Sequence, residues 1–321
     1  MKDALDISVI IPVFNEEDSI IELNNQISNA IQAKYSYELI YINDGSSDTS
    51  KEIINNLIDE NPNIRMISFY RNRGKSDALN IGFKESIGDI VITIDSDLQD
   101  DPNEFDKLIN KLNNGFDMVS GWKKNRKDPL SKTFPSKIFN YVLRFITNIK
   151  IHDFNCGLKA YKSKVVKSLD IYGGLHRFIP VLVKNAGFTI SEEEINHRER
   201  KFGISKYGSS RIFHGFFDLI TILFLKKYFN RPLHFFGKLG ILFSSFGLLI
   251  NIYLSYKWIV FNYLNNGLKF SINRPLLFLG ILLLLVGIQF ISIGLIGELI
   301  VYFNRKKNFG SDSAEYINFN S

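Results

Sequence analysis

The chain of 321 residues carries 39 lysines and arginines against 33 acidic residues, a net charge of +6, and 45% of its residues are hydrophobic. This length accommodates one α/β domain of about 200 residues and a membrane hairpin, and its basic residues crowd near apolar segments, which favours anionic lipid over nucleic acid as a partner. The single cysteine, Cys156, excludes an intramolecular disulfide and a cysteine-based metal centre.

The first half of the sequence alternates between apolar, β-branched runs and amphipathic stretches. The predicted strands are 7–13, 39–42, 64–69 and 90–94. The predicted helices are 17–33, 48–59, 75–86 and 103–112, where apolar residues recur three and four positions apart. This alternation predicts an α/β domain with a mostly parallel sheet, and ligands of such sheets collect beyond the carboxyl ends of the strands.

Three polar clusters follow these predicted strands. They are Asn15-Glu16-Glu17, Asn43-Asp44-Gly45 and Asp95-Ser96-Asp97. In the third cluster two carboxylates lie one residue apart, and such a pair can hold a hard divalent cation against a diphosphate. Taken alone, an Asp-x-Asp triplet more often caps the helix that follows it, here one that Pro102 would open. The convergence of three clusters on one sheet edge favours a ligand site.

Two other motifs are excluded. Gly74-Lys75-Ser76 resembles the end of a phosphate-binding P-loop, but Phe69 stands where the first glycine of that loop is required. The histidines are scattered at positions 152, 176, 197, 214 and 234, a spacing that argues against a zinc site.

Beyond residue 235 the sequence becomes strongly apolar. It predicts two transmembrane helices, at about 239–261 and 275–303, which contain uncharged stretches long enough to span roughly 27 to 35 Å. The alternative is a pair of buried helices in a soluble core. Lysines and arginines lie before the first span and after the second, and we expect no amino-terminal signal because Lys2, Asp3 and Asp6 precede a strand. We therefore expect a cytoplasmic-membrane protein with both termini and the α/β domain in the cytoplasm.

Two further segments carry aromatic and aliphatic residues at helical spacing. The first, 131–149, contains Phe134, Ile138, Tyr141, Val142, Phe145 and Ile149. The second runs from Ile212 to Phe229 and has the basic pair Lys226-Lys227 near its end. Each is either an interfacial helix on the membrane or an ordinary core helix. The predicted organisation is an α/β domain at 1–208, a juxtamembrane helix at 209–236, a membrane hairpin at 237–304 and a cytoplasmic tail at 305–321.

Six motifs, taken in chain order, resemble family 2 glycosyltransferases with the GT-A fold, specifically the polyprenyl-phosphate glycosyltransferases similar to dolichol-phosphate mannose synthase. The motifs are Ser8 to Glu17, Asn43 to Asp48, Arg71 to Lys75, Asp95 to Gln99, Asp153 to Tyr161, and Arg200 to Tyr207. The two spans are similar to the bacterial branch with a two-helix anchor, which glucosylates lipid carriers. Asn43 departs from the family, since many relatives carry a further Asp there.

The resemblance implies a role for each candidate site residue. The residues expected to bind the nucleotide sugar are Pro12, Asn15, Glu16, Asp44, Lys75, Asp95 and Asp97. The expected ligands of Mg²⁺ or Mn²⁺ are Asp95, Asp97 and Gln99. The residues expected to bind the acceptor phosphate are Arg126, Arg198, Arg200, Ser205 and Lys206. Asp97, Asp153 and Arg200 are expected to be catalytic, with Asp153 as a weak base, an orienting group or only a structural turn residue.

The expected reaction moves one sugar, with inversion, from a nucleotide sugar to a polyprenyl phosphate. UDP-glucose and undecaprenyl phosphate are the favoured substrates by analogy with the two-span relatives, and the resemblance also suggests a homotetramer. One alternative is a processive polysaccharide synthase, but neither Trp122 nor Trp258 follows an arginine as the Gln-x-x-Arg-Trp motif of those enzymes requires. The other is a noncatalytic membrane scaffold that keeps the fold.

Overall fold

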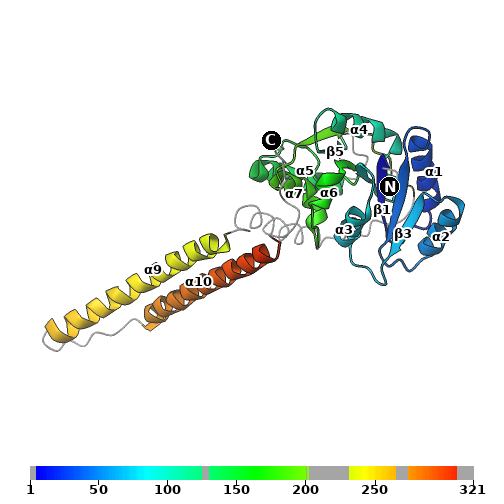
Figure 1. Ribbon diagram of the computed structural model, residues 1–321. Coiled ribbons are helices and arrows are strands. Elements are labelled where there is room, and N and C mark those ends of the chain that lie inside the picture. Colours follow the sequence, from blue (N-terminus) through cyan, green and yellow to red (C-terminus); the bar gives the residue numbers. More distant parts are fainter. Residues whose placement is uncertain (1–4, 125–129, 200, 202–230, 265–273, 309–321) are drawn as a thin grey trace, which may run out of the picture. The chain divides into compact units, whose positions relative to one another are not determined.

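The computed structural model describes residues 5–124, 130–199, 201, 231–264 and 274–308. They belong to two compact units, 1–219 and 220–321 (Figure 1). The predictions for 209–230 and for the tail beyond 308 concern residues outside the described ranges.

A seven-stranded sheet forms the centre of the first unit. Its order is β3-β2-β1-β4-β6-β5-β7. The strands are β1 (Ile7–Val13), β2 (Tyr37–Asn43), β3 (Ile64–Ser68), β4 (Ile90–Thr93), β5 (Met118–Trp122), β6 (Lys159–Lys162) and β7 (Ile190–Glu194). Only β6 runs antiparallel to its neighbours β4 and β5 within this described sheet, and the other paired strands are parallel. The predicted mostly parallel sheet is confirmed.

Helices cover both faces of the sheet. Alternate residues of β1, such as Ile7 and Val9, share one buried cluster with apolar residues of α1 (Ile20–Ile31), α2 (Ser50–Glu60) and α4 (Phe105–Asn113). On the other face, α3 (Lys75–Glu85) packs against β1 so closely that a methyl group on Gly82 would lie 2.6 Å from Ile10 Cγ2. Figure 1 shows α1 and α2 on one side of β1 and α3 on the other.

The remaining elements of this unit fall in its second half. They are η1 (Pro102–Glu104), α5 (Leu130–Thr147), α6 (Ser163–Lys167), η2 (Leu175–Phe178) and α7 (Ile179–Asn185). The four predicted strands and four predicted helices of the first half are present with ends shifted by a few residues. Strands β5, β6 and β7 were not predicted, because they are four or five residues long and β7 reads Ile-Ser-Glu-Glu-Glu, without a run of apolar residues.

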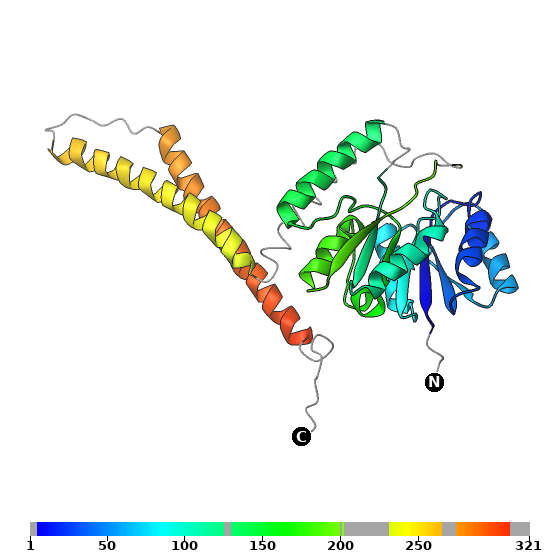
Figure 2. The ribbon, with the colours of Figure 1, turned by 90° about the horizontal axis from the view of Figure 1, so that it is seen from above.

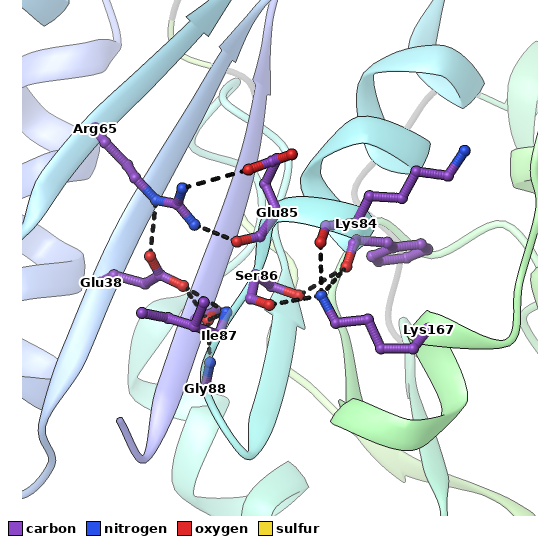
Figure 3. A network of polar contacts seen from close by, with 10 residues as sticks. Glu38, Arg65, Lys84, Glu85, Ser86, Ile87, Gly88 and Lys167 are labelled. Atoms are coloured by element: carbon purple, nitrogen blue, oxygen red, sulfur yellow. Dashed lines mark hydrogen bonds and ion pairs between the residues drawn. The ribbon is translucent and has the colours of Figure 1, made fainter. Parts of the chain in front are cut away.

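A polar network fixes the carboxyl end of α3 (Figure 3). The ammonium of Lys167 donates to the carbonyls of Phe83, Lys84 and Ser86 at 2.9, 2.7 and 2.6 Å. Beside it, the buried carboxylate of Glu38 accepts from Arg65 Nε at 2.8 Å and from the backbone N–H of Ile87 at 2.9 Å. A cation at a helix carboxyl end satisfies carbonyls that lack partners and complements the helix dipole. These contacts therefore hold the carboxyl end of α3 in place.

The second unit contains two long apolar helices. They are α9 (Pro232–Ile259), which continues into a π-helical turn η3 (Val260–Leu264), and α10 (Arg274–Asn308). Both are long and apolar enough to cross a membrane, with mean hydropathies of 1.6 over Pro232–Asn262 and 2.7 over Arg274–Val301. Figure 2 shows them side by side in yellow and orange-red.

Glycines allow α9 and α10 to approach closely. A methyl group on Gly240 would lie 2.7 Å from the carbonyl oxygen of Gly287, and one on Gly247 would lie 2.6 Å from that of Gly280. Glu298 accepts from the backbone N–H of Leu233, in the first turn of α9, at 3.4 Å. Small residues commonly allow such close packing of membrane helices, and here they serve contacts within one chain.

Candidate active site

The candidate site lies where β1, β2 and β4 end. The loops after β1 and β2 are tied together: Asn15 Oδ1 accepts from Ser47 N at 2.8 Å, and Glu16 N donates to Ser50 Oγ at 3.1 Å. Asn15 adopts a left-handed backbone conformation with φ of 53°. Pro12 lies inside β1, opposite Ile42 and within the predicted strand 7–13. The pairing of β1 with β4 ends at Ile10, so Pro12 lies where β1 has lost one of its two neighbouring strands.

Asp44 fixes the loop that leads into α3. Its buried carboxylate accepts from the backbone N–H groups of Arg73 at 2.7 Å and of Gly74 at 2.9 Å. Burial raises the pKa of Asp44, and these two hydrogen bonds oppose the rise. Gly74 directly precedes α3. Asp44 therefore fixes the start of that helix and with it the position of Lys75, its first residue.

Lys75 and Asp95 form an ion pair across the site. The ammonium Nζ of Lys75 contacts Oδ1 of Asp95. Burial would raise the pKa of Asp95, but the charge of Lys75, supported by Lys123 and Lys159, lowers it to about 2. The Asp95 carboxylate is therefore ionised at neutral pH.

Asp95, Asp97 and Gln99 alternate with buried residues. The intervening Ser96, Leu98 and Asp100 are buried, whereas these three are partly exposed. Leu98 has φ of 60°, and Asp97 Oδ1 accepts from Gln99 N at 3.3 Å. Their side chains offer only oxygen and amide groups, a donor set that suits Mg²⁺ or Mn²⁺. Within the described residues no three acidic, histidine or cysteine side chains are arranged to hold a metal ion by themselves, so such an ion would need further ligands from a substrate or water.

Asp153 lies in a turn before β6. It is buried, its Oδ1 accepts from Asn155 N at 3.2 Å, and its carbonyl accepts from Ser120 Oγ at 3.2 Å. Gly157 follows in the same segment, and a methyl group there would lie 2.4 Å from Asp95 Oδ2. The turn therefore has to carry glycine at 157 for the Asp95 carboxylate to occupy its position.

Arg198 binds groups of the protein from α1 and from the loop after β4. Its backbone N–H donates to the carbonyl of Gln99 at 2.9 Å, and its guanidinium contacts Gln26 Oε1 and Asp101 Oδ2, each at 2.6 Å. The neighbouring His197 pairs with Asp100 in an isolated antiparallel bridge. This pairing holds the segment before residue 200 against the Asp95–Gln99 loop. Arg126, Arg200, Ser205 and Lys206 lie outside the described residues.

Three residues at the site were not among the predicted site residues, although the motif Asp153 to Tyr161 contains two of them. Gly157, Lys159 and His176 line a small cavity next to the Lys75–Asp95 pair, together with Asn155 and Tyr161. Burial lowers the pKa of His176 to about 3, with Lys75 and Arg177 adding to the effect, so its ring is neutral. A lysine between Leu158 and Ala160 in an apolar run was the available signal for Lys159. The histidines were considered only as zinc ligands.

Comparison with known proteins gives the family. Residues 8–170 match the model described as glycosyl transferase family 2. The chain belongs to this family. Over 303 residues it is 35% identical to dodecaprenyl-phosphate galacturonate synthase of Rhizobium johnstonii, covering 92% of this chain and 88% of that protein. It is also 32% identical to undecaprenyl-phosphate 4-deoxy-4-formamido-L-arabinose transferase of Shewanella sediminis, with 92% and 86% covered.

A solved structure gives the fold of this glycosyltransferase. Glucosyl-3-phosphoglycerate synthase from Mycobacterium tuberculosis, in complex with Mn²⁺, uridine diphosphate and phosphoglyceric acid, superposes with a TM-score of 0.55 at 20% identity. The match covers 70% of this chain and 79% of that one. The predicted GT-A fold is confirmed, and so is the expectation of a glycosyltransferase enzyme.

The contact between Gly157 and Asp95 gives the first prediction. We expect Gly157→Ala to lower sugar transfer by at least about 100-fold, because the added methyl displaces an ionised carboxylate at the site. The matched control is Gly237→Ala, where the methyl meets Leu233 at an ordinary 3.7 Å. Steady-state kinetics of the purified full chain would measure both. Activity within a few-fold of wild type in Gly157→Ala would contradict the assignment of Asp95 to the site.

Proposed function

We propose that this enzyme transfers one sugar from a nucleotide diphosphate sugar to a polyprenyl phosphate at the cytoplasmic face of a membrane. The observation that carries the proposal is the ionised Asp95, paired with Lys75 and followed by partly exposed Asp97 and Gln99. The names of the two relatives support a polyprenyl-phosphate acceptor, and the two apolar helices support a membrane location.

The donor half of the reaction is governed by negative charge. As the bond from the sugar to the diphosphate breaks, charge builds on the departing nucleotide, and a divalent cation would neutralise it. Asp95, Asp97 and Gln99 would hold that ion. Pro12, Asn15, Glu16 and Asp44 would contact the base and ribose, but the oxygens of Asp44 already bind backbone N–H groups. Asp44 would then act mainly by shaping the loop.

The acceptor half needs little base catalysis. A phosphate monoester has a second pKa of about 6, so the lipid phosphate is largely a dianion at neutral pH and already a nucleophile. Its attack opposite the leaving group inverts the anomeric carbon. Asp153 would orient the acceptor or act as a weak base. Arg126, Arg200, Ser205 and Lys206 would bind its phosphate, while Arg198 would position the segment that carries three of them.

The exposed face of α5 supports an approach to the bilayer. Tyr141 and Phe145 are one helical turn apart and are 66% and 83% exposed, whereas Leu143 and Asn140 are buried in the domain. Figure 2 shows α5 as the long green helix at the margin of its unit. An aromatic pair on one helical face is typical of interfacial helices. We propose that α5 contacts the membrane, with both chain termini cytoplasmic as the flanking charges predict.

The identity of the transferred sugar and the number of subunits in the assembly are further parts of the proposal. Glucose from UDP-glucose is the donor predicted from the sequence, whereas the two relatives are named for galacturonate and for 4-deoxy-4-formamido-L-arabinose. A panel of UDP-sugars incubated with polyprenyl phosphate, followed by mass analysis of the lipid, would identify the donor. The homotetramer is likewise a proposal, which light scattering of the detergent-solubilised protein would test.

Substitution of Asp97 tests whether the protein is a metal-dependent enzyme or a scaffold. We expect Asp97→Ala to lower transfer by about 100-fold or more, because the expected cation loses a carboxylate ligand, without a fall in melting temperature. Chelation by EDTA should abolish wild-type transfer, and added Mn²⁺ or Mg²⁺ should restore it. The control is Asp59→Ala on α2, an exposed carboxylate away from the site. Undiminished transfer in Asp97→Ala or in EDTA would refute the proposal.

Substitution of the aromatic pair tests the role of α5. In Tyr141→Ser with Phe145→Ser, we expect binding to anionic vesicles to weaken and transfer to a long-chain polyprenyl phosphate to fall by about tenfold, because apolar area is lost from the interface. Transfer to a short, water-soluble prenyl phosphate should change less than threefold. Ile21→Ser, which replaces an exposed isoleucine of α1, serves as the control. An equal loss with both acceptors would argue against a membrane contact.

A further inference from the structure

The small cavity beside Asp95 is rich in hydrogen-bond donors. Its polar lining comes from Lys75, Asn155, Lys159, Tyr161 and His176, and Gly157, which also lines it, packs against the Asp95 carboxylate. The carboxylate of Asp95 is already engaged by Lys75. A ligand group that fits this lining would therefore be an acceptor of hydrogen bonds.

Lys159 is the least compensated charge in this lining. It is 3% exposed, and its ammonium donates to the carbonyl of Cys156. The charges of Asp95 and Asp153 act on it from a distance, but neither carboxylate forms an ion pair with it within 4 Å in the described part of the chain. Removing an ammonium from water is costly, and a single carbonyl does not neutralise it. The site therefore gains most from a ligand that brings a negative charge to this side chain.

His176 adds a neutral donor to the same cavity. Its backbone N–H donates to Ser76 Oγ at 3.0 Å, and Ser76 Oγ lies 2.9 Å from Nδ1 of the ring. Because Ser76 accepts from the backbone, its own proton is available to Nδ1, which assigns the ring proton to Nε2. An Nε2–H donor next to a buried ammonium complements the two oxygens of a carboxylate.

We propose that this cavity is a carboxylate subsite and that the sugar transferred is a uronic acid. The inference rests on the proposed function. In that function the divalent cation held by Asp95, Asp97 and Gln99 would already neutralise the diphosphate of the donor. The sugar is the remaining part of the donor that can carry charge. A uronate would give Lys159 a counter-ion in direct contact, whereas a neutral hexose would leave the ammonium with only the more distant charges of Asp95 and Asp153.

The test compares charged and neutral donors on the full chain in detergent, with Mn²⁺ and polyprenyl phosphate. UDP-glucuronate and UDP-galacturonate are measured against UDP-glucose and UDP-galactose. We expect kcat/KM to favour a uronate by at least about tenfold over its matching hexose. In Lys159→Met this ratio should fall toward one, because transfer of the uronate drops. In Lys184→Met, which alters an exposed lysine on α7, the ratio should stay as in wild type.

Two results would overturn the inference. One is preference of the wild type for a neutral hexose. The other is an equal loss with both donors in Lys159→Met, which would leave Lys159 a support for the Cys156 turn or a contact of the diphosphate. If Lys159→Met does not fold, calorimetric affinities of wild type for the four UDP-sugars decide the matter, and equal affinities contradict the subsite. If no sugar is transferred at all, the proposed function fails, while the same affinities still judge the cavity.

Discussion

The ion pair between Lys75 and Asp95 determines the geometry of the edge at which β1, β2 and β4 end. Three separate segments of the chain have to take up their positions for this ion pair to form. Asp44 binds the two backbone N–H groups that precede α3, β4 delivers Asp95, and Gly157 leaves room for its carboxylate. The pair keeps Asp95 ionised although burial opposes this, so the site offers a preformed negative group. An ionised carboxylate can hold a divalent cation, and that cation would stabilise the negative charge that develops on the leaving diphosphate.

Helix α3 connects this edge of the sheet to the opposite one. Its first residue is Lys75, and its last carbonyls are bound by Lys167 and by the Arg65 guanidinium (Figure 3). Charge-assisted hydrogen bonds each contribute about 1.5 to 3 kcal/mol when well formed, less where solvent reaches them. A helix held at both ends cannot shift along its axis without breaking several of them. The stability of the fold and the position of the Lys75 ammonium are thus coupled.

Sequence reasoning was most accurate where a pattern had a direct physical cause. The βαβα alternation predicted the first four strands and helices, and the polar residues after β1, β2 and β4 do meet at one edge. It did not find β5 to β7, because short strands with lysines or glutamates lack a distinctive period. It also did not predict that the side chains of Asp44 and Arg198 bind other groups of the protein. Hydrogen bonds between segments distant in the sequence cannot be predicted from the spacing of residues along the chain. Lys159 and His176 were missed for the same reason: their importance comes from burial, which only the folded chain reveals.

The central claim is that Asp95, Asp97 and Gln99 hold a cation against the diphosphate of a bound nucleotide sugar. The most direct measurement is to locate Mn²⁺ by anomalous scattering in crystals of the full chain grown with UDP. The account predicts one strong Mn²⁺ peak within about 2.5 Å of an Asp97 carboxylate oxygen and of the diphosphate. A Mn²⁺ peak remote from all three residues, or UDP bound at this sheet edge with no Mn²⁺ beside it, would contradict the account.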